Sequence, residues 1–71
     1  MDKAGLVKEV RLRLGHSQED LARALHISYA TVNRWENGQT SPSKLAWHQF
    51  VVYCREMSDK GKLKCPEGME A

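Results

Sequence analysis

The sequence lacks the segments that membrane proteins, secreted proteins and most enzymes require. No apolar run approaches the roughly 20 residues that span a bilayer. The N-terminal stretch MDKAGLVKEV has neither the apolar core nor the cleavage site of a signal peptide. There is no Gly-rich phosphate loop, no Ser-His-Asp set with its supporting motifs and no pair of carboxylates in an evident cleft. We therefore expect a cytoplasmic protein that is not an enzyme, binds no cofactor and does not enter a membrane.

Cysteine is scarce, with two residues among 71. Cys54 lies in an apolar helical pattern, where a buried and inert thiol is expected. Cys65 lies in the polar stretch KGKLKCPEGMEA, where a free, exposed thiol is expected. The histidines His16, His26 and His48 have no Cys, His or carboxylate partner at ligand spacing. The sequence therefore predicts no metal site.

Neither positive nor negative charge is present in large excess. The net charge is +2, and the pI near 8.7 lies below the value of about 9 that is usual for nucleic-acid-binding domains. An apolar fraction of 41% and a charged fraction of 28% are typical of a globular protein with one small core. The placement of Arg23, Arg34 and Lys44 around three expected helices is the only sign of an anionic partner.

What the sequence does contain is helical periodicity with clear start and stop signals. A first helix is predicted over residues 3–14, stopped by Gly15, because apolar residues recur there at helical spacing: Leu6, Val7, Val10 and Leu14. Ser17 is a predicted N-cap for a short second helix that begins at Gln18 and runs to Leu25.

A third helix, about as short as the second, is expected behind a cap at Ser28. It carries Val32 and Trp35 on one face and ends at Asn37 and Gly38. Only His26 and Ile27 separate the second helix from this cap.

A fourth helix is predicted to begin with Ser41 as cap and Pro42 in the first helical position, and to run through about Met57. It is apolar nearly all round, whereas a single contact stripe covers little more than a third of a helix. We therefore expect either self-association through this helix or packing on a domain missing from the chain. A mobile polar tail over residues 58–71 is expected to follow a domain of residues 1–57.

Two short helices joined by a tight turn, with small Ala22 inside the first, form a helix-turn-helix pattern. Through SQEDLARAL and TVNRWENGQTSP the chain resembles the lambda-repressor-like, Cro-type helix-turn-helix family, from about Leu6 to Tyr53. The residues that match at fixed offsets are Gln18, Leu21, Ala22, Val32, Trp35, Glu36, Asn37 and Gly38. The resemblance implies a compact all-α domain of four helices, or five if the chain is incomplete, whose third helix lies in the DNA major groove.

The resemblance also implies roles for single residues. The expected base contacts are Arg34, which can pair with guanine, Asn33, which can pair with adenine, and Tyr29 and Ala30, which can meet thymine methyl groups. Contacts to the DNA backbone are expected from Gln18, Ser28, Thr31, Asn37, Thr40 and Lys44.

Other residues are expected to be structural. The family pairs an arginine matching Arg11 with a glutamate matching Glu36, and a buried Arg11 with no anion would be costly. Ala22, Val32 and Trp35 are expected to pack in the interior. His26 stands where the family usually has glycine in left-handed conformation, a region that histidine tolerates better than most residues.

The leading hypothesis is therefore sequence-specific binding of double-stranded DNA by a repressor-like transcriptional regulator that acts as a homodimer. Three alternatives remain open. The first is an antitoxin of a toxin-antitoxin pair, the second a DNA-recognition or docking module of a larger enzyme, and the third a protein-interaction domain that has lost DNA binding.

Overall fold

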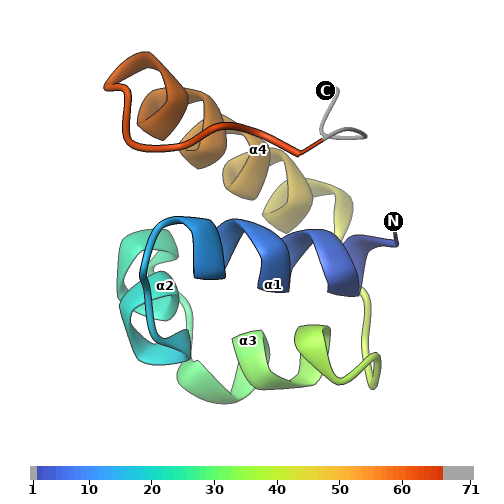
Figure 1. Cartoon of the computed structure of the whole chain (residues 1–71). Coiled ribbons are helices and arrows are strands. Elements are labelled where there is room, and N and C mark those ends of the chain that lie inside the picture. Colours follow the sequence, from blue (N-terminus) through green and yellow to red (C-terminus); the bar gives the residue numbers. More distant parts are fainter. Residues whose placement is uncertain (1, 67–71) are drawn as a thin grey trace.

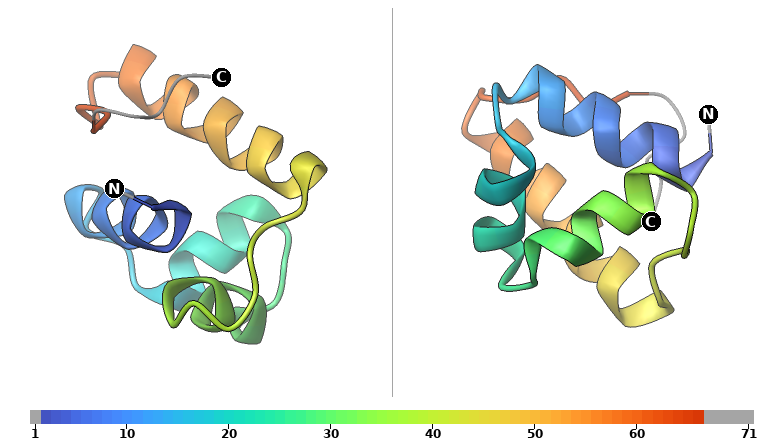
Figure 2. Two further views of the ribbon diagram at one scale, coloured as in Figure 1. Left: turned by 90° about the vertical axis from the view of Figure 1, so that its right-hand side faces the viewer. Right: turned by 90° about the horizontal axis from the view of Figure 1, so that it is seen from below.

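A computed structural model of the chain describes residues 2–66 and contains, within that range, four helices and no strand. The helices are α1 (Lys3–Arg13), α2 (Gln18–Leu25), α3 (Tyr29–Glu36) and α4 (Lys44–Asp59). The predicted all-α fold is confirmed. Figures 1 and 2 show α3 on the side of the molecule opposite the C-terminal half of α4, with α1 between the two.

The starts of α2 and α3 agree with the sequence-based prediction. The Ser17 hydroxyl accepts a hydrogen bond from the Asp20 backbone N–H at 3.0 Å. The Asp20 carboxylate in turn accepts one from the Ser17 N–H at 2.9 Å, which completes a capping box. Ser28 caps α3 by accepting from the Thr31 N–H at 3.2 Å.

The predicted start of α4 is wrong by two residues. The helix begins at Lys44, not at Pro42, and its cap is Ser43, not Ser41. The Ser43 hydroxyl accepts from the Ala46 N–H at 3.1 Å, whereas Pro42 is buried. A proline also favours extended backbone in the residue before it, so Ser41 and Pro42 carry the chain inward before the helix starts.

The four helices of residues 2–66 all end in the same way. The residue after the last turn has a positive φ: Gly15, His26, Gly38 and Gly61. The next N–H then donates to the carbonyl five residues earlier, as in the bond of 3.0 Å from Ile27 to Ala22, which is the pattern of a Schellman motif. His26, with φ 58° and ψ 41°, therefore occupies a position that glycine fills at the other three ends.

The core is formed by the inward faces of all four helices. Val7, Leu21, Val32 and Phe50 are fully buried and come from α1, α2, α3 and α4 in turn. Burying a side chain of this size contributes about 1.5–3 kcal/mol relative to leaving it exposed.

The segment after α4 folds back onto the domain. The helix continues two residues past the expected end at Met57, and Leu63 is then only 6% exposed and belongs to the core. The Arg13 guanidinium donates to the Lys64 carbonyl at 2.7 Å, which ties this segment to the end of α1. Residues through 66 thus pack with the expected domain of residues 1–57, and residues 67–71 of the expected tail lie outside the described part of the chain.

The two thiols lie close together between α4 and this segment. Cys54 is buried, and burial raises the pKa of its thiol to about 12. Cys65 is half-buried, with its Sγ 3.8 Å from the Cys54 carbonyl oxygen, so the expectation of an exposed thiol was wrong. Part of the apolar surface of α4 is therefore covered by the chain's own C-terminal segment. Leu45, 69% exposed, is the largest apolar exposure on α4.

Candidate nucleic-acid interface

The α2–α3 unit turns sharply at His26 and places α3 across α2. The left-handed backbone of His26 lets the chain reverse within three residues before α3 begins. Ala22, only 4% exposed, lies in the core, where its small side chain permits a close crossing of the two helices. His26 thus forms the turn, and Ala22 lies in the interior.

One side of α3 is buried and the opposite side is free. Val32 is fully buried and Trp35 is 5% exposed, so these two side chains fix the helix to the core. The opposite side, which we call the outer face of α3, consists of Tyr29, Ala30, Asn33, Arg34 and Asn37. These residues share one side because they recur at intervals of three and four. Tyr29 is half exposed, Ala30, Arg34 and Asn37 are exposed, and Asn33 is half-buried.

The start of α3 is held by two hydroxyl groups. The Ser28 and Thr31 hydroxyls are 2.8 Å apart and hydrogen-bonded, in addition to the cap that Ser28 makes with the Thr31 N–H. Ser28 is exposed and Thr31 half-buried. Both keep the first turn of α3 in place at the surface, next to Tyr29.

Arg11 and Glu36 form an ion pair between α1 and the end of α3. The Arg11 Nε and Nη2 groups donate to the two carboxylate oxygens of Glu36 at 2.7 and 3.0 Å, and Nη1 donates to the His16 carbonyl at 3.0 Å. The side chains are 13% and 4% exposed, respectively. The hydrogen bond to Glu36 raises the pKa of Arg11, which therefore stays charged. The pairing implied by the family resemblance is thus present in this structure.

Three amide side chains continue from this ion pair. Gln18 Nε2 donates to Glu36 Oε1 at 3.2 Å. Asn33 Nδ2 donates to Gln18 Oε1 at 3.1 Å, and Asn37 Nδ2 donates to Asn33 Oδ1 at 2.9 Å. Sequence reasoning assigned these residues separate roles and did not foresee that they touch, because Gln18 and Asn33 lie on different helices. The fixed spacing of Gln18 and Glu36 in the family was the only signal.

The remaining expected backbone contacts lie beyond the end of α3. Thr40 is in the connection between α3 and α4, Lys44 is the first residue of α4, and both are exposed. Within residues 2–66 no hydrogen bond links the side chain of either residue to the outer face of α3. Their position is compatible with a contact at the flank of a ligand seated on α3.

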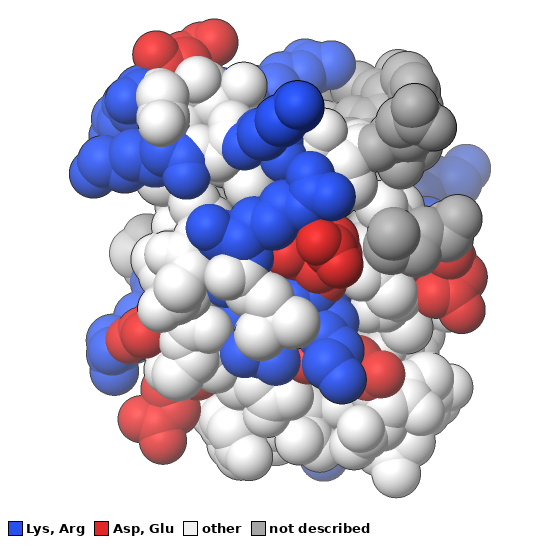
Figure 3. Space-filling view, in the orientation of Figure 1, with Lys and Arg blue, Asp and Glu red and all other residues white. Residues whose placement is uncertain are grey.

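Charge is distributed unevenly over the surface. In Figure 3 the Lys and Arg side chains gather over the upper part of the molecule, whereas the lower part, where α3 lies, is mostly uncharged. Lys60, Lys62 and Lys64 are exposed in and beside the C-terminal segment. By contrast, α3 carries only Arg34 and the paired Glu36. The outer face of α3 is thus polar with a single charged side chain, Arg34, a surface suited to hydrogen bonding more than to bulk charge attraction.

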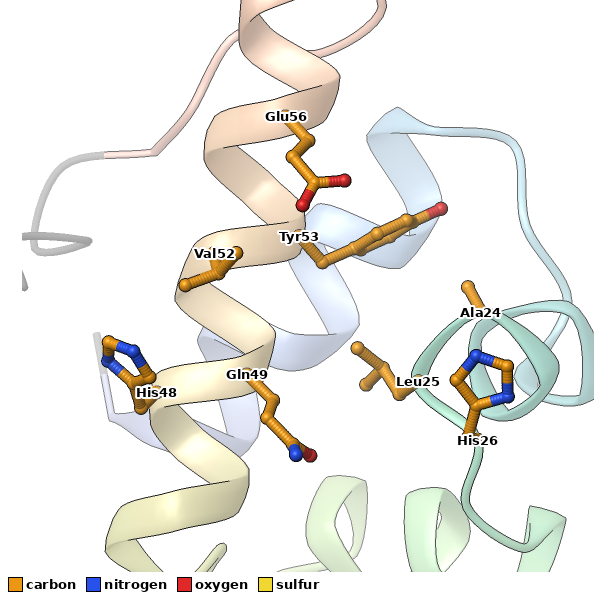
Figure 4. A pocket seen from close by; sticks show the side chains of 8 residues that line it. All are labelled: Ala24, Leu25, His26, His48, Gln49, Val52, Tyr53 and Glu56. Carbon is orange, nitrogen blue, oxygen red and sulfur yellow. The ribbon is translucent and has the colours of Figure 1, made fainter.

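A shallow groove of about 620 Å³ lies between the end of α2 and α4 (Figure 4). Both His26 and His48 line it, together with Ala24, Leu25, Gln49, Val52, Tyr53 and Glu56. No group of three or more Cys, His, Asp or Glu side chains within residues 2–66 is placed to hold a metal ion. A contact that the sequence did not suggest lies nearby, a hydrogen bond of 2.7 Å between His16 Nε2 and the Tyr53 hydroxyl.

Two short helices joined by a left-handed turn, the second with a buried back and a free polar front, define a helix-turn-helix protein. The Helix-turn-helix family profile matches residues 7–46, and the chain belongs to this family, whose lambda-repressor-like branch it was expected to resemble.

Among curated proteins, the chain is similar to the type II methyltransferase M1.ScrFI of Lactococcus lactis subsp. cremoris, with 49% identity over 56% of this chain and 11% of the methyltransferase. The matched region is thus a small part of that protein. No solved structure matches the chain significantly. In the part of the chain that the structure describes, every helix is too short or too polar to cross a membrane.

Proposed function

We propose that this domain binds double-stranded DNA in a sequence-specific manner, with α3 in the major groove. The observation that carries the proposal is the free outer face of α3, backed by buried Val32 and Trp35. A major groove about 12 Å wide admits one helix and presents hydrogen-bond donors, acceptors and thymine methyl groups. A rigidly held polar helix face is complementary to such a surface.

Arg34 is the proposed main base contact, because its exposed guanidinium can donate two hydrogen bonds to guanine O6 and N7. Tyr29 and Ala30, in the first turn of α3, are proposed to pack on thymine methyl groups. The proposed phosphate contacts are Gln18 at the start of α2 and, at the flanks, Ser28, Thr31, Asn37, Thr40 and Lys44.

Two variants test the proposal together, after selection of a preferred site from randomised duplexes. Arg34→Ala is expected to cost about 1–3 kcal/mol on the best site and to relax the preference at one base-pair position. Lys44→Ala is expected to weaken binding to all sequences alike and to reduce the slope of log affinity against log salt by about one. If the unmodified protein selects no sequence, or Arg34→Ala leaves the selected sequence unchanged, base reading by this residue is refuted.

Two cellular roles fit such a domain. A repressor-like transcriptional regulator is the simpler one. A DNA-recognition or docking module of a larger enzyme is favoured by the similarity to part of a methyltransferase. The two are separated by expressing the isolated domain with a reporter under its selected site. A regulator changes reporter output by itself, whereas a module changes the activity of the enzyme to which it is joined.

Dimerisation through α4 is proposed as the way in which a domain of net charge +2 gains enough DNA contacts, since each added phosphate contact strengthens binding. Exposed Leu45 would lie in that contact. Sedimentation at tens of micromolar, with and without the selected duplex, is expected to reveal a dimer that Leu45→Lys weakens. Monomer in both conditions would instead favour packing of α4 on another domain.

A further inference from the structure

The amide groups of Gln18, Asn33 and Asn37 form one continuous chain of hydrogen bonds that ends on the carboxylate of Glu36. The three links, from Asn37 to Asn33, from Asn33 to Gln18 and from Gln18 to Glu36, measure 2.9, 3.1 and 3.2 Å. This amide relay, as we call it, connects the first residue of α2 with the last turn of α3 and its C-cap residue. Two of its members, Asn33 and Asn37, lie on the outer face of α3, which the proposed function assigns to DNA.

The ion pair sets the direction of every link. An ionised carboxylate only accepts hydrogen bonds, and the Glu36 carboxylate accepts from the Arg11 guanidinium at 2.7 Å. Gln18 must therefore turn its NH2 group toward Glu36 and its oxygen toward Asn33. Asn33 must then present its NH2 group to Gln18 and its oxygen to Asn37. Each amide is oriented by its neighbour, and no link can be reversed while the carboxylate stays charged.

This direction determines what the relay can offer a ligand. A primary amide carries two N–H hydrogens, and each relay member uses one of them. Gln18 and Asn37, at the two ends of the relay, thus keep one N–H each, and both ends lie where helix termini meet the surface. Donors of this kind are complementary to phosphate oxygens, which only accept. Asn33, between them, also keeps one N–H, but it is bonded on both its nitrogen and its oxygen and is half-buried, so its amide is the most constrained of the three.

We propose that Asn33 is a positioning residue that aligns Gln18 and Asn37 as phosphate donors, and that it does not read a base. This inference rests on the proposed DNA binding and replaces the base contact expected for Asn33. The hydrogen bonds to Gln18 and Asn37, together with half-burial, hold the Asn33 amide in the orientation of the relay rather than in one set by a base. The specificity of α3 then comes from Arg34, Tyr29 and Ala30.

The relay is tested first in the free protein, by NMR of the side-chain amides. The chain has five such groups, and Gln39 and Gln49, both exposed, lie outside the relay and serve as internal references. Asn33→Ala is expected to shift the NH2 signals of Gln18 and Asn37 while those of Gln39 and Gln49 stay in place. Unmoved signals of Gln18 and Asn37 in a folded Asn33→Ala variant would overturn the relay.

The role of Asn33 is then tested with DNA. Asn33→Ala is expected to weaken binding to all duplexes by the same factor, about three- to tenfold for one or two lost neutral hydrogen bonds, with an unchanged selection profile. Gln18→Ala/Asn33→Ala is expected to lose less than the product of the two single factors, because the two residues act through one contact. Arg34→Ala, measured alongside, supplies the profile of a lost base contact.

The outcomes separate this inference from the proposed function. If Asn33→Ala changes the preference at one base pair, or if the losses of the two single variants multiply fully, Asn33 acts on DNA by itself and the inference is wrong. If the unmodified protein selects no sequence, the proposed function fails, and the NMR result still decides whether the relay exists.

Discussion

Replacing Arg11 by methionine is expected to destabilise the fold by about 3 kcal/mol, which is the cost typically found when one partner of a buried ion pair is removed. Arg11 donates two hydrogen bonds to Glu36 and one to the His16 carbonyl. Without it, the Glu36 carboxylate, 4% exposed, keeps the Gln18 amide as its only donor among residues 2–66. A small domain of this length has a total stability of roughly 4–10 kcal/mol, so such a loss leaves it marginally folded.

A matched control is available on α2. Arg23 is paired with Asp20 at 2.6 Å, but its side chain is 71% exposed. Arg23→Met makes the same chemical change in water and is expected to cost less than about 1 kcal/mol. The comparison therefore sets a buried arginine with three hydrogen bonds against an exposed arginine with one, both facing a carboxylate.

Urea denaturation followed by circular dichroism measures both losses. A second substitution, Glu36→Met in the Arg11→Met background, is expected to restore most of the stability, because it removes the stranded charge and leaves an apolar pair of similar volume. Equal losses for Arg11→Met and Arg23→Met, or no recovery in the double variant, would refute the reasoning from burial.

Three further predictions concern single side chains. His26→Gly is expected to stabilise the domain by about 1 kcal/mol, because glycine adopts the left-handed conformation without strain, and a loss in chemical denaturation would reveal contacts of His26 that matter more. Hydrogen bonds from Ser17 lower the pKa of Asp20 below its ordinary value of 3.8, so the stability that its charge adds is complete above that value and is lost as the pH falls through the lower folded-state pKa. Asp20→Asn is thus expected to flatten the acid limb of a pH titration of stability, and an unaltered limb would contradict this. Buried Cys54, whose thiol has a pKa of about 12, is expected to resist iodoacetamide at pH 8 until the protein unfolds, while half-buried Cys65 reacts sooner. Mass spectrometry of the two cysteine-containing peptides measures the order of modification. Modification of Cys54 before Cys65 would contradict the observed packing of the C-terminal segment.

The features that the sequence predicted well are those decided by residues close in the chain. A cap residue and the backbone N–H that bonds its side chain are only three residues apart, so Ser17 and Ser28 could be assigned from local spacing alone. The left-handed turn at His26 was expected because the family has glycine there. Arg11 and Glu36 are 25 residues apart, and only the family resemblance predicted that they would meet.

The features that could not be predicted depend on long-range packing. Leu63 stands in a polar stretch without periodicity, so nothing local distinguishes it from an exposed residue, yet it enters the core. Pro42 was expected to open α4 because proline is common in that position, but burial of its ring took precedence. The orientation of Asn33 likewise depends on Gln18, 15 residues away on another helix.

The contact between Arg13 and Lys64 can form only late in the synthesis of the chain. The two residues are 51 positions apart, and at 5–20 residues per second a ribosome needs about 3–10 s to add the later one. Small helical domains fold within microseconds to milliseconds once the whole chain is available, so closure of the core by Leu63 is limited by synthesis of the last segment and not by folding itself. The part of the core that Leu63 covers is therefore the last to be completed during synthesis.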